Sequence, residues 1–111
     1  MFEFGSIVLT QFPFTDMSGA KVRPALVVSR DNDSRADIVL AFISSRATPH
    51  KDSLPINPSS RNGLKVASVV RFDKLATLEK RVVVGKIGNA EGDFLRAARS
   101  VFFGVFGFGA P

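Results

Sequence analysis

Apolar residues gather in short runs that are separated by polar, glycine-rich or proline-rich stretches, a pattern typical of β-strands joined by turns. The run at 36–43 is nearly continuous, which predicts a central strand buried on both faces. Pro55 lacks an N–H for a strand ladder and therefore places its strand at a sheet edge. The mixed alternation of 64–78 indicates a strand that bends or passes a bulge. In chain order the runs predict strands at 7–12, 23–28, 36–43, 53–56, 64–78 and 81–87.

The spacing of apolar residues changes after Gly88 and Asn89. Glu91 and Asp93 place acid near the start of a predicted terminal helix, and its apolar positions recur three and four residues apart, at Phe94, Ala97, Ala98, Val101 and Phe102. The apolar, glycine-rich tail at 102–109 is expected to pack on the sheet or on a second subunit. Short strands with one terminal helix predict a mainly β (α+β) fold, a small partial barrel of strongly bent antiparallel strands. Residues 1–111 are expected to form a single domain.

The amino-acid composition limits the partners and the kinds of functional site that the chain can have. The formal net charge of +5 favours a polyanion such as nucleic acid, or an acidic protein, although a basic surface that only confers solubility fits equally well. The absence of cysteine excludes disulfides, zinc-finger spacing and a thiol nucleophile, and the single histidine, His50, argues against a multi-histidine metal site. We therefore predict no metal and no cofactor. The start of the chain lacks the features of a signal peptide and no apolar run approaches the ~18 residues of a membrane helix, so we expect a cytoplasmic protein with no membrane contact.

Two places in the chain put phosphate-binding chemistry at the end of a strand. Arg23 precedes Pro24, which forces an extended backbone and starts a strand, so the guanidinium stands at the mouth of that strand beside a polar loop carrying Lys21. Ser44, Ser45 and Arg46 follow the buried run in the same way, where a rigid scaffold meets solvent. The simpler readings are a surface ion pair for Arg23 and an ordinary turn for the serines.

The stretch GSIVLTQFPFTDMSGAKVRPALVVS, residues 5–29, closely resembles the amino-terminal signature of the MazF/PemK family of bacterial toxins. It combines Phe-Pro-Phe-Thr-Asp, Ser-Gly, a basic residue and Arg-Pro at one spacing. Ile43-Ser44-Ser45 resembles an Ile-Thr-Ser motif of that family with serine in place of threonine, and Ser68, Val69, Val70 and Asp73 match a later strand in which Ala76 replaces a common arginine. The resemblance covers most of residues 5–88. It implies an SH3-like barrel, a homodimer, an acidic antitoxin and sequence-specific, metal-independent cleavage of single-stranded RNA.

The implied reaction uses the RNA 2′-hydroxyl as the nucleophile. Arg23 is the expected group that stabilises charge on the phosphate, and Ser44 is expected to add a hydrogen bond; these are the predicted catalytic residues. The general base and acid stay unassigned: arginine has too high a pKa, Asp16 and Asp73 read more simply as structural, and His50 has a suitable pKa but sits in a polar loop outside any motif, which favours a surface role. The residues expected to bind RNA are Phe14, Ser18, Gly19, Lys21, Ser45, Arg46, Asp73 and Lys74.

Two other functions remain open from the sequence. A DNA gyrase poison of the CcdB type has a similar barrel and an exposed terminal helix, and it needs no phosphate-binding arginine. A noncatalytic SH3-like nucleic-acid-binding module would account for the serine at position 44 and for the alanine at position 76.

Overall fold

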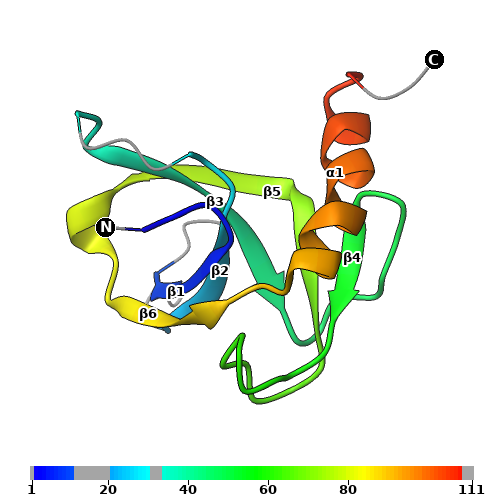
Figure 1. Ribbon diagram of the computed structural model, residues 1–111, viewed down its shortest axis with the longest axis horizontal. Coiled ribbons are helices and arrows are strands. Elements are labelled where there is room, and N and C mark those ends of the chain that lie inside the picture. The colour runs from blue at the N-terminus through cyan, green and yellow to red at the C-terminus, as the bar shows by residue number, and fades with distance from the viewer. Residues whose placement is uncertain (1, 12–20, 31–33, 109–111) are drawn as a thin grey trace.

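The computed structural model describes residues 2–11, 21–30 and 34–108, and these residues form a six-stranded antiparallel sheet with a C-terminal helix. The sheet curls into a half-barrel, with the helix beside β4 and β5 (Figure 1). The predicted fold class is therefore confirmed. The strand order across the sheet is β4-β5-β3-β2-β1-β6. The elements are β1 (Ser6–Thr10), β2 (Arg23–Val27), β3 (Asp37–Ser44), β4 (Ser53–Ile56), β5 (Ser68–Glu79), a 3-10 turn (Lys80–Val82), β6 (Gly85–Asn89) and α1 (Gly92–Val105).

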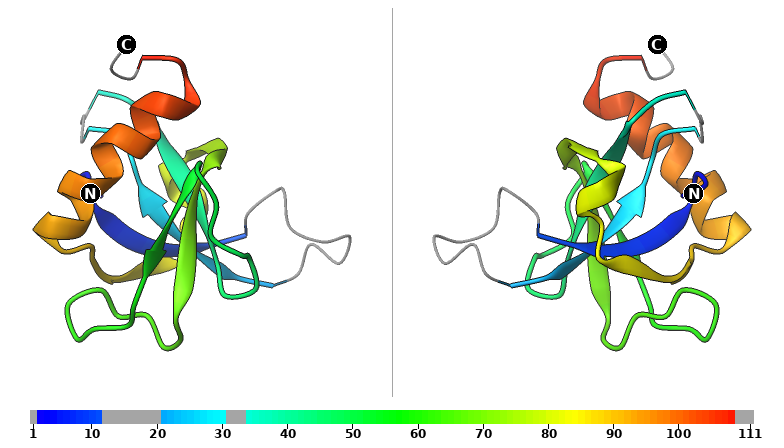
Figure 2. Two further views of the ribbon diagram at one scale, coloured as in Figure 1. Left: turned by 90° about the vertical axis from the view of Figure 1, so that its right-hand side faces the viewer. Right: turned by 90° about the vertical axis from the view of Figure 1, so that its left-hand side faces the viewer.

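The two faces of the sheet carry separate apolar clusters, because side chains alternate along each strand. One cluster packs against α1, which lies over one side of the curled sheet (Figure 2). Its largest buried member is Phe72, which packs edge to face against Phe102 of α1 with 6.3 Å between the ring centroids. The other cluster fills the opposite face and consists of Val8, Ala25, Val27, Ile38, Leu40 and Phe42. We call this second surface the inner face. Toward the end of β3, the same face carries the polar residues of the candidate site.

The central and edge strands agree with the sequence prediction. β3 runs through the middle of the sheet with five buried residues among eight. β4 coincides with the predicted 53–56 strand and lies at the edge, as Pro55 indicated. β5 carries the predicted bulge: Leu75 pairs with Ala41 and Arg71 with Phe42, so that Phe72, Asp73 and Lys74 have no partners on β3. This bulge lets β5 bend between β4 and β3.

Four predicted boundaries were wrong. The strand predicted at 81–87 starts only at Gly85, because β5 extends to Glu79 and the chain reverses through the 3-10 turn, which leaves Val82 and Val84 exposed. Residues 64–67 precede β5 rather than belonging to it. The helix continues to Val105 through the start of the predicted tail, since the apolar spacing of 94, 98, 101, 102 and 105 persists across Gly104. β1 ends at Thr10, and Phe12 lies outside the described residues.

Asn62 connects the loop before β5 to the beginning of α1. Its side chain is fully buried; Oδ1 accepts the N–H groups of Ser59 and Leu64, and Nδ2 donates to the Asn57 carbonyl. The Ser59 hydroxyl in turn donates to the carboxylate of Glu91, the N-cap residue of α1. A buried amide with its hydrogen bonds satisfied stabilises one arrangement of the backbone. Within the described residues, no helix is long and apolar enough to cross a bilayer.

Candidate functional site

Arg23, Thr10 and Ser44 lie on three neighbouring strands. Thr10 of β1 pairs with Arg23 of β2, and Ala25 of β2 pairs with Phe42 of β3. Arg23 and Ser44 lie two residues beyond Ala25 and Phe42 on their strands, and therefore on the same face of the sheet as these two residues. Thr10 and Arg23 are directly opposed, so their side chains point to the same face with Cβ atoms ~5 Å apart. The two predicted catalytic residues therefore lie on the inner face, at the same end of neighbouring strands.

Arg23 is held by its surroundings. It is the first residue of β2, as the Arg-Pro pair predicted, and its side chain is half-buried with the Nε atom shielded from solvent. The residue also takes part in at least one further interaction. Thr10 beside it is buried and donates its hydroxyl to the Val82 carbonyl at 3.4 Å. A half-buried guanidinium at the start of a strand offers a planar fork for an anion.

Ser44 is the last residue of β3, and its oxygen is fixed by the turn that follows. The hydroxyl accepts the backbone N–H of Arg46 at 3.1 Å. Among the described residues the hydroxyl proton meets no acceptor, so this proton is available to a ligand. Ser44 thus helps to form the turn after β3, as the simpler interpretation of the sequence predicted, and its free hydroxyl proton still allows it to bind a ligand. The hydrogen bond also restrains a side chain that lacks the β-methyl of threonine.

The bulge of β5 adds a charged group to the same face. Arg71 lies opposite Phe42 and binds Asp73 through two hydrogen bonds, Nε to Oδ1 at 3.2 Å and Nη2 to Oδ2 at 2.7 Å. The hydrogen bond from Arg71 is the largest cause that lowers the pKa of Asp73 below its ordinary value. Lys74 places its ammonium 5.8 Å above the ring of Phe42. Asp73 is therefore a carboxylate at neutral pH and a weak proton acceptor.

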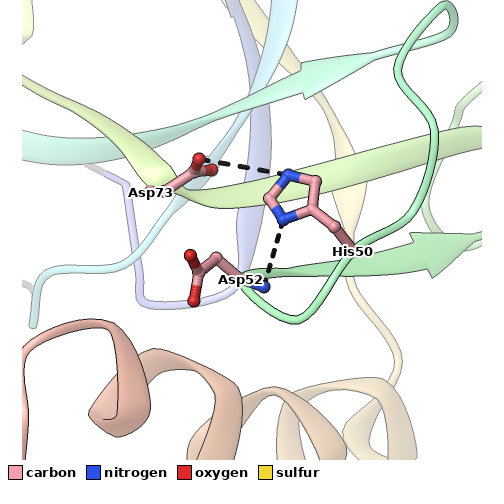
Figure 3. A group of neighbouring side chains, drawn as sticks. All are labelled: His50, Asp52 and Asp73. Carbon is pink, nitrogen blue, oxygen red and sulfur yellow. Dashed lines mark hydrogen bonds and ion pairs between the residues drawn. The ribbon is translucent and has the colours of Figure 1, made fainter.

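His50 approaches this group from the turn before β4, as Figure 3 shows. Its Nδ1 accepts the backbone N–H of Asp52 at 3.2 Å, and its Nε2 lies 4.0 Å from Oδ2 of Asp73. The exposed fraction of the His50 side chain is 38%. The residue is on the surface, as expected. Its contact with Asp73 was not predicted, because the two residues are 23 positions apart in the sequence.

The carboxylates of Asp52 and Asp73 and the imidazole of His50 are close enough to suggest a metal site. Each can offer one ligand atom, and these atoms lie within 4.8 Å of one another. The guanidinium of Arg71, however, already binds both oxygens of Asp73 and would repel a cation. The donor set therefore fits a divalent ion poorly, and the absence of a metal stays a prediction.

The other predicted contact residues divide into two groups. Lys21, Ser45 and Arg46 are exposed and lie within two residues of Arg23 or Ser44. Phe14, Ser18 and Gly19 lie outside the described residues, as does Asp16. Sequence reasoning missed Arg71, although an arginine two positions before an aspartate on a strand puts both on one face. Lys21 and Arg46 thus flank the strand ends that carry Arg23 and Ser44, and Arg71 and Lys74 add positive charge from β5.

The family profile described as "PemK-like, MazF-like toxin of type II toxin-antitoxin system" matches residues 3–102. Among solved structures, an endoribonuclease in complex with its cognate antitoxin from a mycobacterial species is 19% identical and covers 100% of this chain and 99% of its own, with a TM-score of 0.80. The Mycobacterium tuberculosis toxin MazF-mt6 is 20% identical, and the match covers 95% of this chain and 99% of the toxin chain, with a TM-score of 0.79. The matched chain of the MazE-MazF complex from Deinococcus radiodurans is 23% identical, and the match covers 95% of this chain and 94% of that chain, with a TM-score of 0.72. No curated protein sequence matches the chain.

Proposed function

The chain belongs to the PemK-like, MazF-like toxin family of type II toxin–antitoxin systems, and from this membership we propose that it is a sequence-specific, metal-independent endoribonuclease that cleaves single-stranded RNA. The observation that supports the proposal is the register of β1, β2 and β3, from which Arg23 and Ser44 belong to one face of the sheet, at the same end of neighbouring strands. We propose that this cation and this hydroxyl donor contact the same phosphate group.

The reaction follows from the substrate. The 2′-oxygen of RNA attacks the adjacent phosphorus, the bond from phosphorus to the 5′-oxygen breaks, and the 5′-oxygen leaves with a proton. Arg23 binds the nonbridging oxygens as negative charge grows on them, and Ser44 donates its hydroxyl proton to one of these oxygens. Donors aimed at developing charge are typically worth ~3 kcal/mol each in the transition state. No described residue is assigned as general base, since the lowered pKa of Asp73 makes it a weak one.

The surrounding residues are proposed to bind the RNA strand. Lys21, Arg46, Arg71 and Lys74 supply positive charge for phosphates, and Ser45 supplies a hydroxyl. Asp73 holds Arg71 in place and offers its carboxylate to base amino groups. Phe14, Ser18 and Gly19 extend the proposed binding surface outside the described residues. The RNA sequence that is recognised does not follow from these contacts.

The proposal includes partners and a place of action. A mycobacterial relative and the Deinococcus relative were solved with antitoxins, which supports an acidic antitoxin as the partner of this basic chain. We further propose a homodimer that acts in the cytoplasm, where messenger RNA is available, with residues 1–111 working as one toxin domain.

The direct test is incubation of the purified protein with single-stranded RNA in EDTA. We expect discrete fragments with 5′-hydroxyl ends, because attack by the 2′-oxygen leaves the cyclic phosphate on the other fragment. RNA with 2′-O-methyl groups should stay intact under the same conditions. Intact unmodified RNA, or cleavage that requires a divalent ion, would contradict the proposal.

Poisoning of DNA gyrase, as by CcdB, is retained as a second candidate because of one observation. Phe103, Phe106 and Phe108 at the end of α1 are exposed, with exposed fractions of 38%, 46% and 80%. An apolar helix end is a suitable surface for a protein target. Toxicity that survives loss of Arg23 but disappears when Phe106 and Phe108 are changed to serine would favour this candidate.

A further inference from the structure

Single-stranded RNA is commonly bound by stacking of its bases on aromatic side chains, so the exposed rings of this chain are informative. The sequence has no tryptophan or tyrosine, which leaves phenylalanine and one histidine. Four exposed phenylalanines belong to the side of the sheet that α1 covers: Phe4 and Phe103 line the apolar hollow beside α1, and Phe106 and Phe108 follow them at its end. None of these four reaches the inner face.

The described phenylalanines that face the inner side are also unsuitable as stacking surfaces. Phe42 is 8% exposed, and Lys74 lies over its ring. Phe2 is half-buried and packs against the inner-face cluster. His50 differs from both, because 38% of its side chain is exposed. Among the described residues of this face, His50 therefore presents the accessible aromatic ring.

The ring of His50 is held at its edge, which leaves its faces for a ligand. Nδ1 accepts the N–H of Asp52, which assigns the ring proton to Nε2, beside the carboxylate of Asp73. The backbone of the turn is fixed as well, since the N–H of His50 donates to the Ser53 hydroxyl at 2.7 Å and that hydroxyl donates to the His50 carbonyl at 3.0 Å. A ring that is already ordered loses little conformational entropy when a base stacks on it.

The position of His50 connects it to the proposed phosphate site. Its neighbour Asp73 binds Arg71, Arg71 lies opposite Phe42, and Phe42 precedes Ser44 by two residues on the same face of β3. The imidazole thus stands on the β5 side of the neighbouring row, which contains Ala25, Phe42 and Arg71, two residues along the strands from Arg23 and Ser44. An RNA strand whose phosphate lies at Arg23 and Ser44 can extend along this face toward the ring.

On the basis of the proposed ribonuclease function, we propose that His50 is the stacking platform for one base of the single-stranded RNA substrate. The role is that of a binding residue and includes no proton transfer, since the only lone pair of the neutral ring points at the N–H of Asp52. The charged groups that face the ring are the carboxylates of Asp52 and Asp73, with Arg71 beyond Asp73.

The test uses a single-stranded RNA of randomised sequence in which every 2′-hydroxyl carries a methyl group, so that binding is measured without cleavage. Loss of base stacking typically weakens binding about 10-fold or more. We expect that loss for His50→Ala and for His50→Gln, which keeps a polar edge but has no ring. His50→Phe keeps the ring without its nitrogens and should restore most of the affinity. Phe108→Ala, which removes an exposed ring past the end of α1, is the matched control and should bind like the wild-type protein.

A second measurement is independent of affinity. His50 is the only histidine, so the protein gives one imidazole Hε1 signal in proton NMR. A base stacked on the ring should move this signal upfield when the methylated RNA is added. An unmoved signal, equal binding by His50→Ala, or rescue by glutamine rather than phenylalanine would overturn the stacking role. If wild-type protein cleaves unmodified RNA in any of these cases, the ribonuclease proposal stands without His50; if it neither binds nor cleaves RNA, both proposals fail.

Discussion

Arg71 and Asp73 form a two-point ion pair on one face of β5, with distances of 3.2 Å from Nε to Oδ1 and 2.7 Å from Nη2 to Oδ2. The pair sits in the bulge that interrupts the pairing between β5 and β3. Because Asp73 neutralises part of the charge of Arg71 and orients it, the strength of this pair affects both the stability of the bulge and the position of a basic residue on the inner face.

The first prediction concerns acid stability. Arg71 holds the pKa of Asp73 below the ordinary value of 3.8, so the folded state binds this proton more weakly than the unfolded chain does. The resulting stabilisation is fully present above that value and is lost as pH falls through the folded-state pKa. Asp73→Asn should therefore lower the free energy of unfolding at pH 7, and the difference from wild type should shrink below pH 3.8. Urea unfolding at several pH values measures both quantities.

Arg71→Met provides the control for the acid-stability prediction. If the ion pair causes the effect, the double variant should be less destabilised than the sum of the single variants, since each single change already removes the interaction. A difference between wild type and Asp73→Asn that stays constant down to strongly acidic pH would contradict the assignment.

The second prediction concerns Arg23. If its guanidinium binds the developing charge on phosphorus, Arg23→Ala should lower RNA cleavage by about 100- to 1000-fold, as loss of comparable donors does. Arg23→Lys should recover little, because an ammonium lacks the planar fork. Arg30→Ala is a matched control, since Arg30 is an exposed arginine a few residues past the same strand. The measurement is the rate of RNA cleavage by each variant, with folding checked by circular dichroism. Full activity of Arg23→Ala would remove this residue from the mechanism.

Much of this architecture could be predicted from the sequence, and the failures have a common physical origin. Apolar runs identified β1 to β5 because burial of alternate or continuous side chains leaves a local signature. The run Val82-Val83-Val84 looks like a strand by the same criterion, but Lys80–Val82 forms a turn because the length of β5 sets where the chain must reverse. Strand ends therefore depend on partners elsewhere in the chain.

The candidate site was predictable in its parts but not in its assembly. The constraint that Pro24 imposes on Arg23 is local, and so is the turn after Ser44, so both residues could be recognised. Their juxtaposition depends on the register between β2 and β3, and the contact between His50 and Asp73 depends on the bulge in β5. Register and bulges are set by long-range packing, which a pattern within one strand does not encode.

The third prediction concerns the serine that replaces a threonine. Ser44→Ala should lower cleavage by about 10-fold or more, because a hydrogen bond to a charged group is typically worth ~1.5–3 kcal/mol. Ser44→Thr keeps the hydroxyl and restricts its rotamers, so its activity should equal or exceed that of the wild type. Ser45→Ala removes the neighbouring exposed hydroxyl and tests whether position 44 is special. Cleavage rates at saturating RNA are the measurement, and an active Ser44→Ala variant would exclude the hydroxyl from the reaction.

The last prediction compares two glycines of β6. A Cβ atom on Gly88 would lie 2.4 Å from the Arg61 oxygen and 2.4 Å from the Asn62 carbonyl carbon, both of the backbone, whereas one on Gly85 meets nothing within 4 Å. Backbone atoms cannot move aside as a flexible side chain can, and Asn62 is fixed by its own hydrogen bonds. Gly88→Ala should thus destabilise the fold by about 1–3 kcal/mol or more, and thermal unfolding should show it. Gly85→Ala should leave the melting temperature nearly unchanged, because in the same strand it adds the same methyl group to open space. Equal melting temperatures for the two variants would mean that the loop at Arg61 and Asn62 does not pack against β6 as closely as described.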